Sequence, residues 1–103
     1  MSARRRRLVL APDARRDLSE ILVYTEQQWG KQQRIKCQAM IDQALRHLAM
    51  YPNLGRGRDE ISPGLRSYPV GSHVVYYRVS EHELIVNRIV HGRRDITETG
   101  IVP

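Results

Sequence analysis

Two stretches of helical periodicity meet at a single glycine, and this arrangement constrains the fold more than any other feature of the chain. Apolar residues recur at helical spacing from Pro12 to Trp29 and again from Lys31 to Met50. Pro12 suits the first position of a helix, where its missing N–H would be unpaired in any case. Gly30 can adopt the positive φ of a helix cap. Because Gly30 alone separates the two stretches, we expect an antiparallel helical hairpin.

The segments on either side of this hairpin have the composition of strands. Residues 5–10 end in three consecutive apolar side chains, and residues 65–70, 73–79 and 84–91 follow one another through short turns. Residues 53–64 are rich in glycine and charge and are expected to form a loop. The expected order is β-α-α-β-β-β. This order predicts an α+β domain in which the helical hairpin packs on one face of an antiparallel sheet.

The apolar stripes of the two helices predict the core of this domain. The residues expected to pack there are Leu18, Ile21, Tyr24, Trp29, Ile35, Ile41, Leu45 and Leu48. Both faces of the last two strands are at least half apolar, and one hairpin covers only one of them. The other face is therefore expected either to contact a partner or to stay partly exposed as an apolar surface. Ala11 stands where a capping serine or threonine is usual, which should cost about 1 kcal/mol of helix stability.

Length and composition exclude several classes of protein. A chain of 103 residues has room for one core, so we expect a single domain over 1–103 with flexible ends at 1–5 and 97–103. Cys37 is the only cysteine, and no histidines or carboxylates have metal-ligand spacing, so neither a disulfide framework nor a metal or other cofactor is expected. No apolar run approaches the roughly 18 residues that span a bilayer. We expect a cytoplasmic protein without a membrane partner.

The charge of the chain points to an acidic partner. Seventeen Lys and Arg against eleven Asp and Glu give a net charge of +6, and only Lys31 and Lys36 are lysine. The arginine fork pairs with carboxylates or phosphates, so the partner is either nucleic acid or an acidic protein segment. One Trp and no Phe argue against a stacking platform for single-stranded nucleic acid.

Several short motifs occur together along the chain. They are Asp17-Leu18, Ile21, Tyr24 and Trp29-Gly30; Tyr51-Pro52 with Gly55; Pro63-Gly64-Leu65-Arg66; the strand GSHVVYYRV at 71–79; and the closing segment RIVHGRRD at 88–95. Together they cover about residues 7–96 and resemble the ParE branch of the RelE/ParE toxin superfamily. No one of them would suffice alone.

This resemblance implies the toxin of a type II toxin–antitoxin pair, which acts by binding protein rather than as an enzyme. The implied target is DNA gyrase, with growth arrest and plasmid maintenance as consequences. The implied partner is an acidic ParD-like antitoxin that forms a hetero-oligomer with the toxin, and DNA would be met only through that complex or through gyrase. The target-binding residues would be His91, Arg93, Arg94 and Asp95. The antitoxin-binding residues would be Leu18, Leu22, Arg66, Tyr76 and Arg78.

Two alternatives stay open. RelE-like relatives cleave messenger RNA on the ribosome, and His91, Arg88 and Arg93 would be the catalytic residues of such a ribonuclease. The cleaving relatives usually carry an arginine where this chain has Val74, which argues against that activity. The second alternative is an inactive toxin that serves only as a corepressor with its antitoxin. His91 and His73 also have a plain structural interpretation, as side chains that hold the ends of strands.

Overall fold

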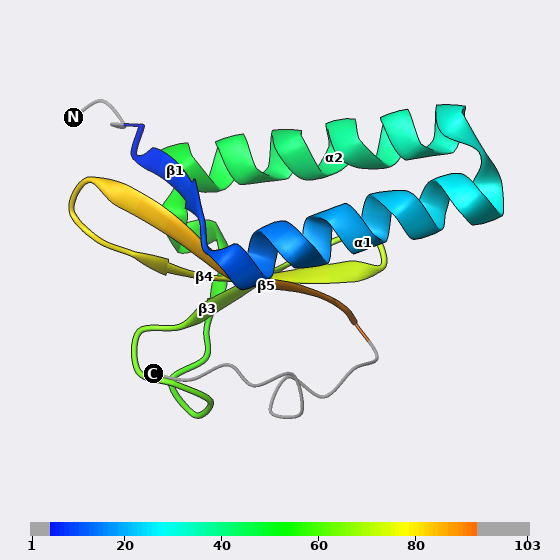
Figure 1. The fold of residues 1–103 in the computed structure, drawn as a ribbon. Coiled ribbons are helices and arrows are strands. Elements are labelled where there is room, and N and C mark those ends of the chain that lie inside the picture. The colour runs from blue at the N-terminus through cyan, green and yellow to red at the C-terminus, as the bar shows by residue number, and fades with distance from the viewer. Residues whose placement is uncertain (1–4, 93–103) are drawn as a thin grey trace.

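The computed structural model describes residues 5–92 and confirms the α+β architecture. The elements, in chain order, are β1 (Arg7–Leu10), α1 (Pro12–Trp29), α2 (Lys31–Met50), the 3-10 turn η1 (Pro52–Leu54), β2 (Arg56–Gly57), β3 (Arg66–Val70), β4 (His73–Val79) and β5 (Glu83–His91). Figure 1 shows the two helices lying together on one side of a sheet. No helix in this part of the chain is long and apolar enough to cross a membrane.

Gly30 turns the chain between the two helices, as expected. It has φ 92°, and its N–H donates to the Glu26 carbonyl at 2.9 Å, which closes the last turn of α1. An ion pair between Arg34 and Glu26, with 2.7 Å from Nε to Oε1, ties the start of α2 to the end of α1. At the other end of α1, Ala11 occupies the N-cap without a side-chain hydrogen bond.

The sheet is mixed, which corrects the expectation of an antiparallel sheet. Its strand order is β1-β5-β4-β3-β2; β5, β4, β3 and β2 are antiparallel neighbours, but β1 runs parallel to β5. Short turns fix the antiparallel pairs. Two helices and three strands separate β1 from β5, so no turn revealed how β1 would pair. The segment expected to be only a loop also contains η1 and the short strand β2.

The main core lies between the hairpin and the sheet. Its fully buried members include Ile41 and Leu48 of α2 and Val75, Tyr77 and Val86 of the sheet. The expected core positions Leu18, Ile21 and Leu45 also pack into it. The Tyr77 hydroxyl accepts from the Gly55 N–H at 2.9 Å and donates to the Pro52 carbonyl at 2.6 Å, so this buried polar group is paired at both ends.

Three expected core residues are largely exposed. Trp29 is 72% exposed, Tyr24 61% and Ile35 50%, so placing them in the core was wrong. The physical reason is length. An α-helix of 18–20 residues extends for nearly 30 Å, and the hairpin continues past the edge of the sheet at its Gly30 end (Figure 1). The apolar stripe there has no sheet beneath it.

The second face of the sheet is covered in part by the chain itself. Leu65, Tyr76 and Val90 form a small buried cluster, and Ile61 and Val74 pack against it. The segment before β3 therefore folds over part of this face, which was expected either to contact a partner or to stay partly exposed.

Candidate functional site

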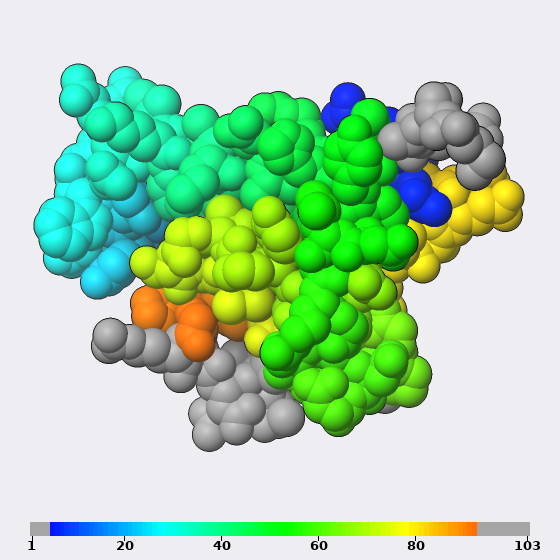
Figure 2. All heavy atoms as spheres, turned by 180° about the vertical axis from the view of Figure 1, so that it is seen from behind, coloured from blue at the N-terminus to red at the C-terminus, as the bar shows by residue number. Residues whose placement is uncertain are grey.

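A groove lies where the hairpin projects past the sheet. It is a cavity of about 760 Å³ lined by α1, α2, the β3–β4 turn and the end of β5. Figure 2 shows these segments gathered on one face, with the far end of the hairpin in blue and cyan and the end of β5 in orange. This volume lies in the range of ligand-sized pockets in proteins.

One wall of the groove is apolar and comes from the exposed part of the hairpin. Tyr24, Trp29 and Met40 line it, and Met40 is 43% exposed. Met40 also approaches Gly71 in the β3–β4 turn so closely that a Cβ at Gly71 would lie 2.8 Å from the Met40 methyl carbon. Gly71 has φ 59°, so both space and backbone favour glycine here. The apolar stripe of the sequence included Tyr24 and Trp29 but assigned them to the core, and it did not include Met40.

The charge of the groove differs from that of the chain. Its charged lining consists of Asp17, Glu20 and Lys36. None of the arginines within residues 5–92 lines it, although arginine dominates the composition. The groove is therefore an apolar surface with a nearly balanced charge on a basic molecule.

An ion pair between α1 and β5 lies at the edge of this groove. Arg88 binds both carboxylate oxygens of Asp17, with 2.7 Å from Nε to Oδ2 and 2.9 Å from Nη2 to Oδ1. Their side chains are 15% and 11% exposed. The hydrogen bond to Asp17 raises the pKa of the Arg88 guanidinium above its already high ordinary value, so Arg88 is charged in this contact. Asp17 is not among the site residues predicted from the sequence, although Asp17-Leu18 is one of the short motifs.

Two histidines meet at the ends of β4 and β5. His73 and His91 are register partners, and their rings pack edge to face with centroids 5.6 Å apart. Burial, and then the nearby charge of His91, lower the pKa of His73. Gly92, the residue after His91, donates its N–H to the Ser72 carbonyl at 2.9 Å, which joins the end of β5 to the turn before β4. This geometry agrees with the structural interpretation of both histidines.

The structure places only part of the expected target-binding set. His91 is exposed at the end of β5 and lines the groove, whereas Arg93, Arg94 and Asp95 lie outside the described residues. Of the three ribonuclease candidates, Arg88 is engaged with Asp17, and Arg93 is likewise outside the described range. Along β5, Ile89 and Val90 separate Arg88 from His91.

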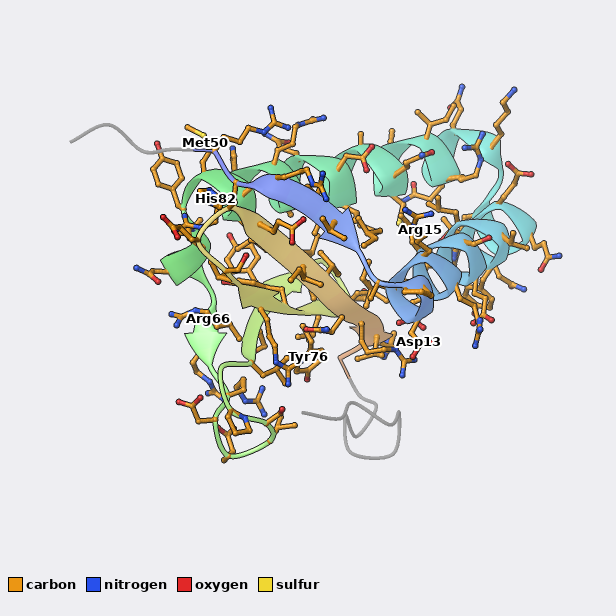
Figure 3. The ribbon with its side chains drawn as sticks, turned by 60° about the vertical axis from the view of Figure 1, so that its left-hand side comes forward. Asp13, Arg15, Met50, Arg66, Tyr76 and His82 are labelled. Atoms are coloured by element: carbon orange, nitrogen blue, oxygen red, sulfur yellow. The ribbon has the colours of Figure 1, made fainter. Side chains whose placement is uncertain are left out.

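The five candidate antitoxin residues do not form one surface. Leu18 and Leu22 lie on α1, and Leu18 packs against the main core. Arg66 donates to the Gly55 carbonyl at 2.7 Å and so supports the η1–β2 segment. Tyr76 and Arg78 lie on β4, with Tyr76 on the side of the sheet that faces away from the helices (Figure 3).

The residues around Tyr76 are joined by polar contacts. The Arg58 guanidinium lies 6.0 Å from the centroid of the Tyr76 ring and binds Glu60 at 2.7 Å. Arg78 donates to Asn87 Oδ1 at 3.1 Å and to the Ser62 hydroxyl. These contacts hold the 58–65 segment against the second sheet face. Within residues 5–92 there is no group of three or more His, Cys, Asp or Glu side chains arranged to hold a metal ion.

Comparison with known proteins identifies a family for nearly the whole chain. The family model described as "ParE toxin of type II toxin-antitoxin system, parDE" matches residues 8–96. A protein of Mycobacterium tuberculosis H37Rv named Toxin ParE1 is 37% identical over 91 residues, which are 87% of this chain and 93% of that protein. Toxin ParE1 of Caulobacter vibrioides is 33% identical over 80% of this chain and 84% of its own length.

Solved structures share the fold. A chain from the chromosomal ParDE toxin–antitoxin system of P. aeruginosa superposes with a TM-score of 0.72 at 24% identity, covering 84% of this chain and 96% of its own. A chain of the toxin–antitoxin complex RelBE2 from M. tuberculosis gives 0.64 at 21% identity, covering 85% and 99%. Both likenesses support the arrangement of a helical hairpin on a sheet.

Proposed function

Because this chain belongs to the ParE toxin family of type II toxin–antitoxin systems, we propose that it arrests growth by binding DNA gyrase and trapping it on broken DNA. The proposal treats the protein as a binding toxin rather than an enzyme. The observation that carries it is the family match over residues 8–96. The engagement of Arg88 with Asp17 adds support, because it occupies one of the cations that a ribonuclease would need.

We also propose that an acidic, ParD-like antitoxin in the cytoplasm neutralises this toxin. Two observations support such a partner: the net charge of +6 and the apolar groove beside the hairpin. The groove suits the apolar face of an amphipathic helix. The acidic flanks of that helix would then reach arginines outside the groove, since none in the described part of the chain lines it. The related solved structures of ParDE and RelBE2 systems agree with a toxin that works as a pair with its antitoxin.

The experiment that tests the proposed target is a gyrase assay with purified, antitoxin-free toxin. The full chain should inhibit supercoiling and accumulate cleaved DNA. A variant that ends at Gly92 should lose at least tenfold in potency, because it lacks Arg93, Arg94 and Asp95, while keeping the bond from Gly92 to the Ser72 carbonyl. Its folding is checked by circular dichroism.

Two results would reject the target. The first is that the folded full chain leaves gyrase unaffected. The second is that the variant ending at Gly92 still arrests growth as strongly as the full chain. Cleavage of messenger RNA in cells expressing the toxin would instead support the ribonuclease alternative. Harmless expression without antitoxin would support the corepressor alternative.

A further inference from the structure

β5 extends beyond its parallel neighbour. β1 pairs with β5 from Arg7↔Glu83 to Leu10↔Val86, and the last backbone bond between them runs from the Ala11 N–H to the Val86 carbonyl at 2.9 Å. The chain then enters α1. The remaining residues of β5 have no strand on that side within the described chain, so the backbone N–H groups that point away from β4 require another acceptor.

Asp17 supplies that acceptor from α1. Its Oδ2 accepts the Ile89 N–H at 2.9 Å, as the carbonyl of a neighbouring strand would. The same carboxylate receives the two-point fork of Arg88, at 2.7 and 2.9 Å. One side chain thus holds two consecutive residues of β5, one through its backbone and one through its guanidinium.

Because the contact of Asp17 with Arg88 is buried, it is stronger than an exposed ion pair and restricts the orientation of the two side chains. Among the ion pairs of the described residues, it is the one in which both side chains are less than a fifth exposed. Exposed pairs such as Arg7–Glu83 are screened by water and contribute little. A two-point, charge-assisted contact shielded from water restricts orientation as well as distance.

The contact lies two residues before the exposed end of the strand. His91 follows Ile89 and Val90, its ring packs on His73, and Gly92 bonds to the Ser72 carbonyl. The strand end is therefore held from two sides, by α1 through Asp17 and by the start of β4. The positions of His91 and Gly92 depend on both contacts.

We propose that Asp17 is a positioning residue for target binding, which fixes the end of β5 through Arg88 and Ile89 so that His91 meets the target in one orientation. This inference rests on the proposed function, in which that end of the chain contacts gyrase. Asp17 touches no target itself. A contact made by α1 thereby controls the orientation of a binding surface at the end of β5.

A direct role for Arg88 predicts the opposite result for the same substitution. If the Arg88 guanidinium contacted the target, Asp17→Ala would release it and preserve or increase activity. If Asp17 positions the strand end, Asp17→Ala lowers activity because the end of β5 loses its acceptor and its ion pair.

The test compares Asp17→Ala and Asp17→Asn with two controls. Asp17→Asn keeps an acceptor oxygen for one of the β5 donors, so it also serves if the alanine variant folds poorly. Asp13→Ala removes an exposed carboxylate on the same helix that pairs with Arg16 at 4.0 Å and takes no part in the hydrogen bonds to Arg88 and Ile89. Ile41→Val lowers thermal stability through the buried core on α2, far from the strand end in sequence. The readouts are amide hydrogen exchange over residues 88–92 and gyrase-cleaved DNA against toxin concentration, both measured on the full chain.

We expect amide exchange at Ile89 to be at least tenfold faster in Asp17→Ala than in wild type. We also expect Asp17→Ala to need at least tenfold more toxin for the same amount of cleaved DNA. Asp17→Asn should give intermediate values in both measurements. Both controls should poison gyrase like wild type. A folded Asp17→Ala with full potency, or with unchanged exchange at Ile89, overturns the inference. If the wild-type toxin does not poison gyrase, the proposed target is wrong, and growth arrest becomes the activity readout for the same variants.

Discussion

At the scale of single residues, the structure shows how many of the arginines already serve the fold. Arg88 binds Asp17, Arg66 binds the Gly55 carbonyl, and Arg78 binds Asn87. A hydrogen bond to Glu60 likewise raises the pKa of Arg58. The net charge of +6 therefore does not tell how many arginine side chains are available to bind a partner. Residue by residue, much of the arginine bias holds loops and strand ends in place.

His73 gives a pH prediction at this scale. Burial lowers the pKa of His73 below the usual value near 6.5, so the folded protein resists protonation that the unfolded chain accepts. The stability that His73 contributes is present above pH 6.5 and is lost as the pH falls through the lower pKa of the folded state. The other ionisable groups that line the same groove are Asp17, Glu20 and Tyr24 on α1, Lys36 and Cys37 on α2 and His91 on β5.

Thermal melts between pH 7.5 and 5.5 check this expectation. His73→Gln should reduce the loss of Tm over that range, by on the order of 2 °C for a domain of this size. The matched control is His82→Gln, because His82 is exposed in the β4–β5 turn. Equal pH dependence in wild type and His73→Gln would contradict the prediction.

At the scale of elements, the mismatch between a long hairpin and a shorter sheet creates the groove. Ile41 and Leu48 of α2 are buried over the sheet, whereas Tyr24 and Trp29, towards the Gly30 end of α1, are exposed and line the groove. A helix stripe longer than the surface it covers leaves an apolar patch, and such patches mark binding sites. The hairpin is thus both the cover of the core and one wall of the groove.

Trp29 tests the hairpin as a binding element. In the proposed complex the antitoxin helix lies in the groove, and exposed tryptophans at interface centres often account for 2 kcal/mol or more, roughly thirtyfold in affinity. Trp29→Ala should therefore weaken antitoxin binding by at least tenfold in calorimetry without lowering Tm, since Trp29 is 72% exposed. Val23→Ala is the control: Val23 is 53% exposed on the same helix but does not line the groove. Equal affinities for the two variants would exclude the groove as the antitoxin site.

At the scale of the whole molecule, charge and shape separate two kinds of surface. The described chain has principal extents of 41 × 33 × 20 Å, so it is a thin body whose groove opens on one side. The groove is apolar and nearly balanced in charge, whereas the molecule as a whole is basic. Long-range attraction of an acidic partner and short-range apolar contact are consequently supplied by different surfaces.

This separation predicts how salt affects binding of the antitoxin. Screening shortens the Debye length from about 10 Å at 0.1 M to about 3 Å at 1 M, which removes steering by the net charge. The association rate should fall on the order of tenfold between low and high salt, while the dissociation rate changes little because apolar contacts dominate it. Stopped-flow fluorescence measures both rates. A salt effect confined to dissociation would contradict the separation.

Much of this protein follows from local sequence. The helical periods around Gly30, the proline that begins α1 and the short turns between β3, β4 and β5 determine the elements and the antiparallel pairs, because each depends on neighbours in sequence. The family motifs likewise depend on spacing along the chain, and the match over residues 8–96 agrees with them.

Tertiary structure decided the rest, because those features depend on contacts between distant segments. The parallel pairing of β1, the exposure of Trp29 and the coverage of the second sheet face arise only when helix and sheet lengths are compared in space. Asp17 and Arg88 are 71 positions apart, and no local pattern relates a carboxylate on α1 to an arginine on β5. The sequence by itself determined the two helices and the four longer strands, and packing determined which of their side chains meet and where η1 and β2 form.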